Sequence, residues 1–146
     1  MADYTPVAVP GSTYTFQASG TVAGGDLVGM SGPLTVTRVS SAASLAFVGV
    51  AGTDAAIGAK VTVFIGKMIN DSVAEGTVAS GDQLVSSSVA NRQVKALAVV
   101  NVNVNATFSD TEVETALNTA VNQARGVLGV AVSAATDNQT VRWVQR

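Results

Sequence analysis

Apolar and polar side chains alternate along several short segments of the chain, which is the pattern of β-strands with one covered face. Residues 34–39 show this alternation, and residues 44–50 form a more continuous apolar run. Residues 60–65 are predicted to form a strand with both faces largely covered. Residues 92–107 are rich in β-forming residues and are predicted to form one long strand or two joined strands. Gly-Asp pairs flanked by β-forming residues indicate tight turns between such strands. The pattern therefore predicts a mainly β protein.

The hydrophobic period changes over residues 109–125, where apolar residues recur at intervals of three and four. Ser109 and Glu112 have the spacing of a helix-capping box, and Arg125 and Gly126 are typical of a last turn and a left-handed C-cap. This predicts one amphipathic helix of about four turns. Its apolar face consists of Val113, Ala116, Leu117, Ala120, Val121 and Ala124. Because half of the face is alanine, it is expected to pack closely on a flat sheet or on another subunit.

Part of the chain is repeated. Residues 20–28 and 76–84 share a Gly-Thr-Val-Ala-x-Gly-Asp frame, 56 positions apart. Residues 48–51 and 128–131 match as Val-Gly-Val-Ala and Leu-Gly-Val-Ala, 80 positions apart. The two offsets differ by 24 positions, so the second copy carries an insertion of that size, which contains the predicted helix. The repeat indicates an internal duplication.

The duplication divides the chain into an arm and two β units. Residues 1–13 contain Pro6 and Pro10, which favour an extended path, so this arm is either a loose tail or a strap on a neighbouring subunit. Residues 14–70 form the first unit and residues 71–146 the second. The predicted fold is two related β-rich lobes, barrel-like or sandwich-like, with one helix at about 109–125 inserted in the second lobe.

Several residues are candidate contacts with other subunits. The asparagines that alternate with valines after residue 100 either form a hydrogen-bonding ladder with a partner or line a solvated strand face. Trp143 is expected either to seal the core of the second lobe or to anchor the carboxyl terminus in an interface, where Trp is enriched. The candidate contact residues are Tyr4, Pro6, Val7, Pro10, Asn101, Asn103, Asn105, Trp143 and Arg146.

The chain has few charges for its length. Only 12% of its 146 residues are charged and 47% are hydrophobic, whereas about 25% are charged in ordinary soluble domains. This favours a surface covered by neighbouring subunits over a small monomeric domain. The net charge is −2 and the Lys and Arg residues are scattered, so direct nucleic-acid binding is not expected. The chain shows no signal-peptide pattern and no apolar run of about 18 residues, so synthesis in the host cytoplasm and no membrane span are expected.

Histidine and cysteine are both absent. Their absence excludes Ser-His-Asp and Cys-His catalysis and thiolate or imidazole metal sites. The seven Asp and three Glu residues lie mostly in predicted turns or at the start of the helix. A turn role is therefore favoured over calcium binding, for which the oxygen ligands would be Asp26, Asp54, Asp71 or Asp82. We expect no enzyme activity and no catalytic, metal or cofactor site.

Some of these motifs occur in a fixed order. A Gly-Asp-Leu-Val turn precedes Val-Gly-Val-Ala, which precedes Gly58-x-Lys60-Val-Thr-Val-Phe-Ile-Gly66. This order resembles a family of small tailed-bacteriophage head proteins, the capsid decoration or cement proteins. The resemblance covers residues 15–66 best. The second copy matches only through the internal repeat, and the helix at 109–126 has no counterpart in the family pattern.

The resemblance implies a structural virion protein that binds the outer surface of a phage capsid and stabilises the lattice of major capsid protein subunits. It also implies a homo-oligomer, with a trimer favoured. Another phage structural component, such as a tail-tube, head-completion or minor capsid protein, is the alternative. A carbohydrate-binding or hydrolytic β-domain is disfavoured, because sugar stacking needs exposed aromatics and aromatic residues make up only 5% of the chain.

Overall fold

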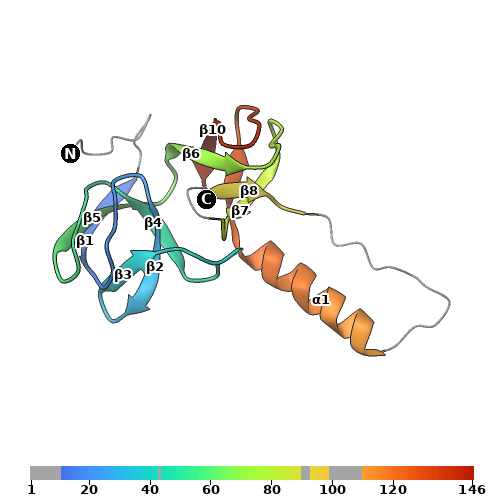
Figure 1. Ribbon diagram of the computed structural model, residues 1–146, viewed down its shortest axis with the longest axis horizontal. Helices are drawn as coiled ribbons and strands as arrows, with labels where there is room; N and C mark the ends of the chain where they lie inside the picture. The colour runs from blue at the N-terminus through green and yellow to red at the C-terminus, as the bar shows by residue number, and fades with distance from the viewer. Residues whose placement is uncertain (1–10, 43, 90–92, 99–109) are drawn as a thin grey trace.

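The protein consists of two closed five-stranded β-barrels and one helix (Figure 1). The structure is a computed structural model that describes residues 11–42, 44–89, 93–98 and 110–146. In chain order the elements are β1 (Ser12–Ala18), β2 (Leu27–Gly32), β3 (Thr35–Arg38), β4 (Phe47–Ala51), β5 (Lys60–Ile65), β6 (Ile69–Glu75), β7 (Gln83–Ser86), β8 (Val94–Ala96), α1 (Asp110–Arg125), β9 (Val127–Ala131) and β10 (Thr140–Gln145). The fold is therefore mainly β, with two related lobes and one helix inserted in the second, as the sequence predicts.

The first barrel closes in the strand order β1-β3-β2-β4-β5. β1 pairs in parallel with β3, and the other pairs are antiparallel. Alternate side chains along the strands point inward, because successive residues of a strand face opposite sides. The core residues are Phe16, Ala18, Val22, Val28, Val36, Ala51, Ala55, Val61 and Val63.

The second barrel repeats this topology, with β6, β7, β8, β9 and β10 in the places of β1 to β5. Its only parallel strand pair again joins the first and third strands of the unit, β6 and β8, among the residues that the structure describes. Ala74 pairs with Val94 there, as Ala18 pairs with Val36 in the first barrel. The helical insertion enters between β8 and β9, at the position of the β3–β4 connection.

The repeated Gly-Asp turn has the same hydrogen bonds in both barrels. Asp26 Oδ2 and Asp82 Oδ2 each accept a hydrogen bond from the backbone N–H three residues earlier, at 2.9 and 2.8 Å. The preceding residues, Gly25 and Gly81, have φ values of 90° and 96°, in the left-handed region that other residues rarely adopt. The turn therefore requires both residue types, which accounts for their presence in both copies.

The glycine of the second shared motif is required by close strand approach. A Cβ atom at Gly49 would lie inside van der Waals contact of the backbone oxygen of Phe64, and one at Gly129 would do the same with Val144. These contacts join β4 to β5 and β9 to β10. The motif keeps its glycine because no side chain fits between the two strands.

The predicted strands differ from the observed ones mainly after residue 92. Residues 60–65 form β5, while β3 lies within residues 34–39 and β4 overlaps residues 44–50. Residues 92–107 do not form one unbroken strand, because β8 ends at Ala96; the alternative of two joined strands stays a prediction, since residues 99–107 lie outside the described residues. The length of β8 follows from its pairing, since only Val94, Lys95 and Ala96 pair with residues of β6 or β7.

The two barrels pack together through side chains that point outward from the first barrel. Leu27 and Val50 are 3% and 0% exposed and belong to the apolar cluster that contains the core of the second barrel. The equivalent residues of the second barrel are Gln83, which is exposed, and Val130, which is half-buried. This difference between the copies identifies the face of the first barrel that the second barrel covers.

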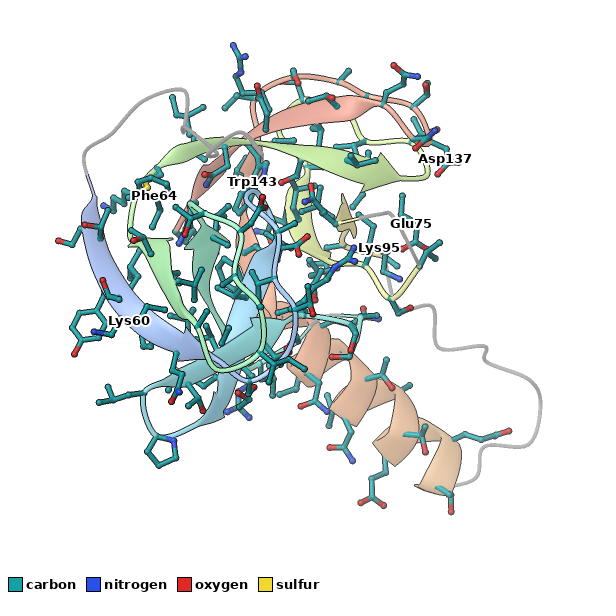
Figure 2. The ribbon with its side chains drawn as sticks, turned by 60° about the vertical axis from the view of Figure 1, so that its left-hand side comes forward. Lys60, Phe64, Glu75, Lys95, Asp137 and Trp143 are labelled. Carbon is teal, nitrogen blue, oxygen red and sulfur yellow. The ribbon has the colours of Figure 1, made fainter. Side chains whose placement is uncertain are left out.

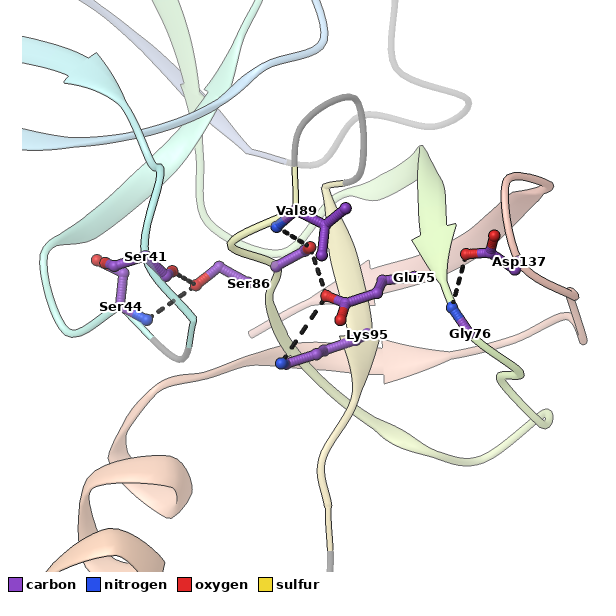
Figure 3. A network of polar contacts seen from close by, with 9 residues as sticks. Ser41, Ser44, Glu75, Gly76, Ser86, Val89, Lys95 and Asp137 are labelled. Atoms are coloured by element: carbon purple, nitrogen blue, oxygen red, sulfur yellow. Dashed lines mark hydrogen bonds and ion pairs between the residues drawn. The ribbon is translucent and has the colours of Figure 1, made fainter.

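Polar contacts also join the two barrels (Figure 3). Ser86 Oγ donates a hydrogen bond to the backbone oxygen of Ser41 and accepts one from the backbone N–H of Ser44, both at 2.8 Å. Gln93 Nε2 donates to the backbone oxygen of Gly25 at 2.8 Å. These directional contacts restrict the orientation of one barrel relative to the other.

Helix α1 extends away from both barrels (Figure 1). It begins at Asp110 and ends at Arg125, close to the predicted limits. The left-handed C-cap predicted at Gly126 is wrong, because this residue is buried without a positive φ and leads directly into β9. In the described part of the chain, no helix has the length and apolar character that crossing a bilayer needs.

Candidate interaction surfaces

Trp143 lies inside the second barrel and not at an interface. Its side chain is 0% exposed, and its Nε1 donates a hydrogen bond to Ser72 Oγ at 3.0 Å. Figure 2 shows it among the strands, whereas Lys60 lies at the periphery of the first barrel. Its candidate contact role is therefore corrected to a core role, because no atom of its side chain reaches the surface.

The last residue of the chain is held against the second barrel. Arg146 is exposed, and its backbone N–H donates to the backbone oxygen of Leu128 at 3.0 Å. Its role as a contact stays a prediction. The other candidate contacts lie outside the described residues and stay predictions as well: Tyr4, Pro6, Val7, Pro10, Asn101, Asn103 and Asn105.

Two further aspartates serve the turns of the barrels. Asp54 Oδ1 accepts a hydrogen bond from the backbone N–H of Gly24 at 2.8 Å. Asp137 Oδ1 accepts one from Gly76 at 3.0 Å (Figure 3). Each contact joins two turns of the same barrel, so these carboxylates have a structural role.

The carboxylates on β6 form ion pairs with neighbouring strands. Asp71 accepts two hydrogen bonds from the guanidinium of Arg142, at 2.9 and 3.0 Å. Glu75 Oε2 lies 3.8 Å from Lys95 Nζ and accepts a hydrogen bond from Ser87 Oγ (Figure 3). Among the described residues, no three His, Cys, Asp or Glu side chains are grouped as a metal site.

Three large apolar side chains are exposed on the first barrel. Tyr14, Leu34 and Ile57 are 51%, 61% and 71% exposed, and we call them the barrel-1 patch. The Tyr14 ring packs on Phe16 with centroids 4.9 Å apart. Phe16 and Leu34 line an open depression with Gly58, the residue after Ile57. Of the three exposed residues, Leu34 lines this depression itself, and Tyr14 contacts its wall through Phe16.

Leu34 has a strained backbone conformation. Pro33 and Leu34 connect β2 to β3, and Leu34 has a φ of 53°. These φ signs are those of a type II turn, in which glycine is usual at the second position. A non-glycine residue with positive φ raises the free energy of the folded state by about 1 kcal/mol or more. The chain nevertheless has a large apolar side chain there.

The second barrel has no counterpart of the patch at the positions that can be compared. Asn70 stands at the position of Tyr14, and Asp137 at that of Ile57. Sequence reasoning missed the patch because isolated exposed apolar residues are common on protein surfaces. Comparison of the two copies position by position would have found it, because the fold is shared and the side chains differ.

The apolar face of α1 is the second candidate surface. Val113, Leu117 and Val121 are 41%, 62% and 47% exposed. Packing of this face on a sheet of the same chain is therefore not observed. The other expectation for the face, contact with another subunit, is not tested by a single chain.

The arrangement of both barrels is shared with a solved structure. The chain is similar to the head fiber gp8.5 N base of bacteriophage phi29, with a TM-score of 0.57 and 16% sequence identity. The similarity covers 92% of this chain and 93% of that one. No family model matches the sequence. No curated protein matches it either. At this identity the likeness establishes a common fold that includes both barrels.

Proposed function

We propose that this chain is a non-enzymatic structural protein of a tailed-phage virion, which binds the outer surface of the head and stabilises the lattice of major capsid protein subunits. The observation that carries the proposal is the fold likeness to the phi29 head fiber base, which extends over both barrels. The motif order in residues 15–66, which resembles capsid decoration proteins, supports the same setting from the sequence.

The barrel-1 patch is the proposed contact with the capsid. It combines a Tyr and two large aliphatic residues that are more than half exposed. Large apolar side chains that stay exposed beside an open depression, as Leu34 does, are candidates for a protein contact. The strained turn at Leu34 supports this assignment, because a large side chain there destabilises the free protein.

Co-sedimentation with phage heads tests the proposed function. Purified protein is mixed with unexpanded heads and with expanded heads of the phage that encodes it, and bound protein is measured after centrifugation. Saturable binding to expanded heads supports a decoration role. Absence of binding to both forms of head would refute it and leave a tail or head-completion role.

Replacement of Leu34 by glycine separates binding from stability. Leu34→Gly is expected to leave the melting temperature unchanged or raise it, because glycine adopts the positive φ without strain. The same change is expected to weaken head binding by about tenfold, since it removes an apolar side chain from the contact. Val132→Gly is the control, because Val132 is an exposed apolar residue of the second barrel. Equal binding by Leu34→Gly and the unchanged protein would exclude the barrel-1 patch.

The predicted arm has its own test. Deletion of residues 1–10 is expected to weaken head binding more than it lowers the melting temperature. If the deletion alters neither quantity, the arm does not act as a strap on a neighbouring subunit.

The phi29 likeness favours a second candidate function, a base by which a fibre is attached to the head. The two candidates differ in what bound protein does to the capsid. A stabilising protein raises the temperature at which expanded heads release their DNA, whereas a base that only attaches leaves this temperature unchanged.

A further inference from the structure

Helix α1 presents an apolar face that the described residues of its own chain leave largely exposed. The face contains two rows of residues, each with a spacing of four. One row is large (Val113, Leu117 and Val121) and the adjacent row is small (Ala116, Ala120 and Ala124). The large residues are 41% to 62% exposed. The large row forms a ridge and the small row a groove, and helices pack by fitting the ridge of one into the groove of the other.

We propose that α1 packs antiparallel against α1 of a second copy of this chain. Val113, Leu117, Ala120 and Ala124 are spaced by four, three and four residues, which is the a/d spacing of a helix pair. This inference does not depend on the function proposed above.

Side-chain size favours the antiparallel direction. If the second helix is reversed about the midpoint between residues 118 and 119, Val113 lies level with Ala124 of the second copy. Leu117 then lies level with Ala120 of that copy. Each pair of residues at the same level combines one large and one small side chain, so the side-chain volume is even along the contact. A parallel pair would instead place Leu117 beside Leu117 and Ala120 beside Ala120, which alternates crowded layers with empty ones.

Charge favours the same direction. Glu114 and Arg125 lie eleven residues apart, which is about three helical turns, so they occupy the same edge of the apolar face. In the antiparallel register, Arg125 of one copy lies level with residue 112 of the other copy. Glu114 is two residues further along that helix, which is about 3 Å along the axis. The helix dipoles also oppose each other in this direction. A parallel pair would bring two acidic first turns together.

The position of α1 in the chain leaves room for this contact. The helix extends away from both barrels, and its last residue connects through Gly126 to β9 (Figure 1). In an antiparallel pair the second barrels of the two copies therefore lie at opposite ends of the contact. The pair is isologous, with the same residues contributed by each copy, as in two-fold dimers.

Cysteine cross-linking tests both the contact and its direction, because the chain contains no cysteine. Val113→Cys and Ala124→Cys proteins are oxidised separately and as a mixture. The proposal predicts a disulfide-linked dimer mainly in the mixture, since each residue lies level with the other. Asn122→Cys, on the opposite face, is the control and should not cross-link. Dimers formed by each single variant alone would show a parallel contact and overturn the proposal, as would the absence of dimers in the mixture.

A second measurement separates loss of contact from loss of folding. In sedimentation over a concentration series, Leu117→Gln is expected to raise the dissociation constant by about tenfold or more, because both copies lose a buried apolar side chain. Asn118→Gln, on the solvent side of the helix, should leave it unchanged. Both variants should keep the melting temperature of the barrels. Equal dissociation constants for the two variants would refute the contact.

Discussion

Leu27 is the residue through which the packing of the two barrels can be measured. It belongs to a strand of the first barrel, but its side chain is 3% exposed within the apolar cluster of the second barrel. Leu27→Ala removes three carbon groups from this cluster, at about 0.8 kcal/mol for each. The remaining cavity increases the loss, so we expect the free energy of unfolding to fall by about 3 kcal/mol.

The assay is urea denaturation followed by the fluorescence of Trp143, the only tryptophan of the chain. Trp143 lies in the core of the second barrel, so its signal reports the unfolding of the barrel that does not contain the substitution. Gln83→Ala is the matched control, because Gln83 is the exposed equivalent of Leu27. We expect this control to change stability by about 0.5 kcal/mol or less. If Leu27→Ala leaves the Trp143 transition unchanged, the barrels unfold independently and the reasoning is wrong.

Three further changes test the internal structure of the second barrel, each by thermal or chemical denaturation followed by circular dichroism. Trp143→Phe should lower the free energy of unfolding by about 2 kcal/mol or more, because it leaves a cavity and removes the hydrogen bond to Ser72 Oγ. A loss below about 0.5 kcal/mol would contradict the buried hydrogen bond. Gly129→Ala should lower the free energy of unfolding by about 3 kcal/mol or more, because the added Cβ would collide with the backbone oxygen of Val144. If the free energy of unfolding does not change, β9 and β10 are farther apart than in this structure. Asn138→Ala should lower stability by about 1 kcal/mol, because Asn138 has a φ of 63°, and Asn138→Gly, which tolerates this φ, should not lower it.

The repeat and the hydrophobic pattern determine much of the fold. The offsets of 56 and 80 positions relate strands that occupy equivalent places in the two barrels, and the insertion between them contains α1. These features are readable because they are local. A turn that needs positive φ requires Gly81, and close strand approach requires Gly129, whatever else the chain does.

The sequence also predicts where helix α1 lies, because its capping residues and its hydrophobic period are local signals. It does not predict what covers the apolar face of the helix. Packing on a sheet and packing on another subunit require the same pattern of Leu117 and its neighbours. The structure leaves Leu117 62% exposed, which removes the sheet of the same chain from these possibilities.

Only the tertiary structure decides which apolar residues of the strands are buried. Leu27 and Tyr14 are both apolar residues of strands in the first barrel, yet Leu27 is 3% exposed and Tyr14 is 51% exposed. Trp143, which the sequence left between a core and an interface, is fully buried. A strand pattern records that a side chain can be covered, but the partner that covers it depends on how the barrels pack. That packing results from contacts between residues far apart in the chain, which no local pattern contains.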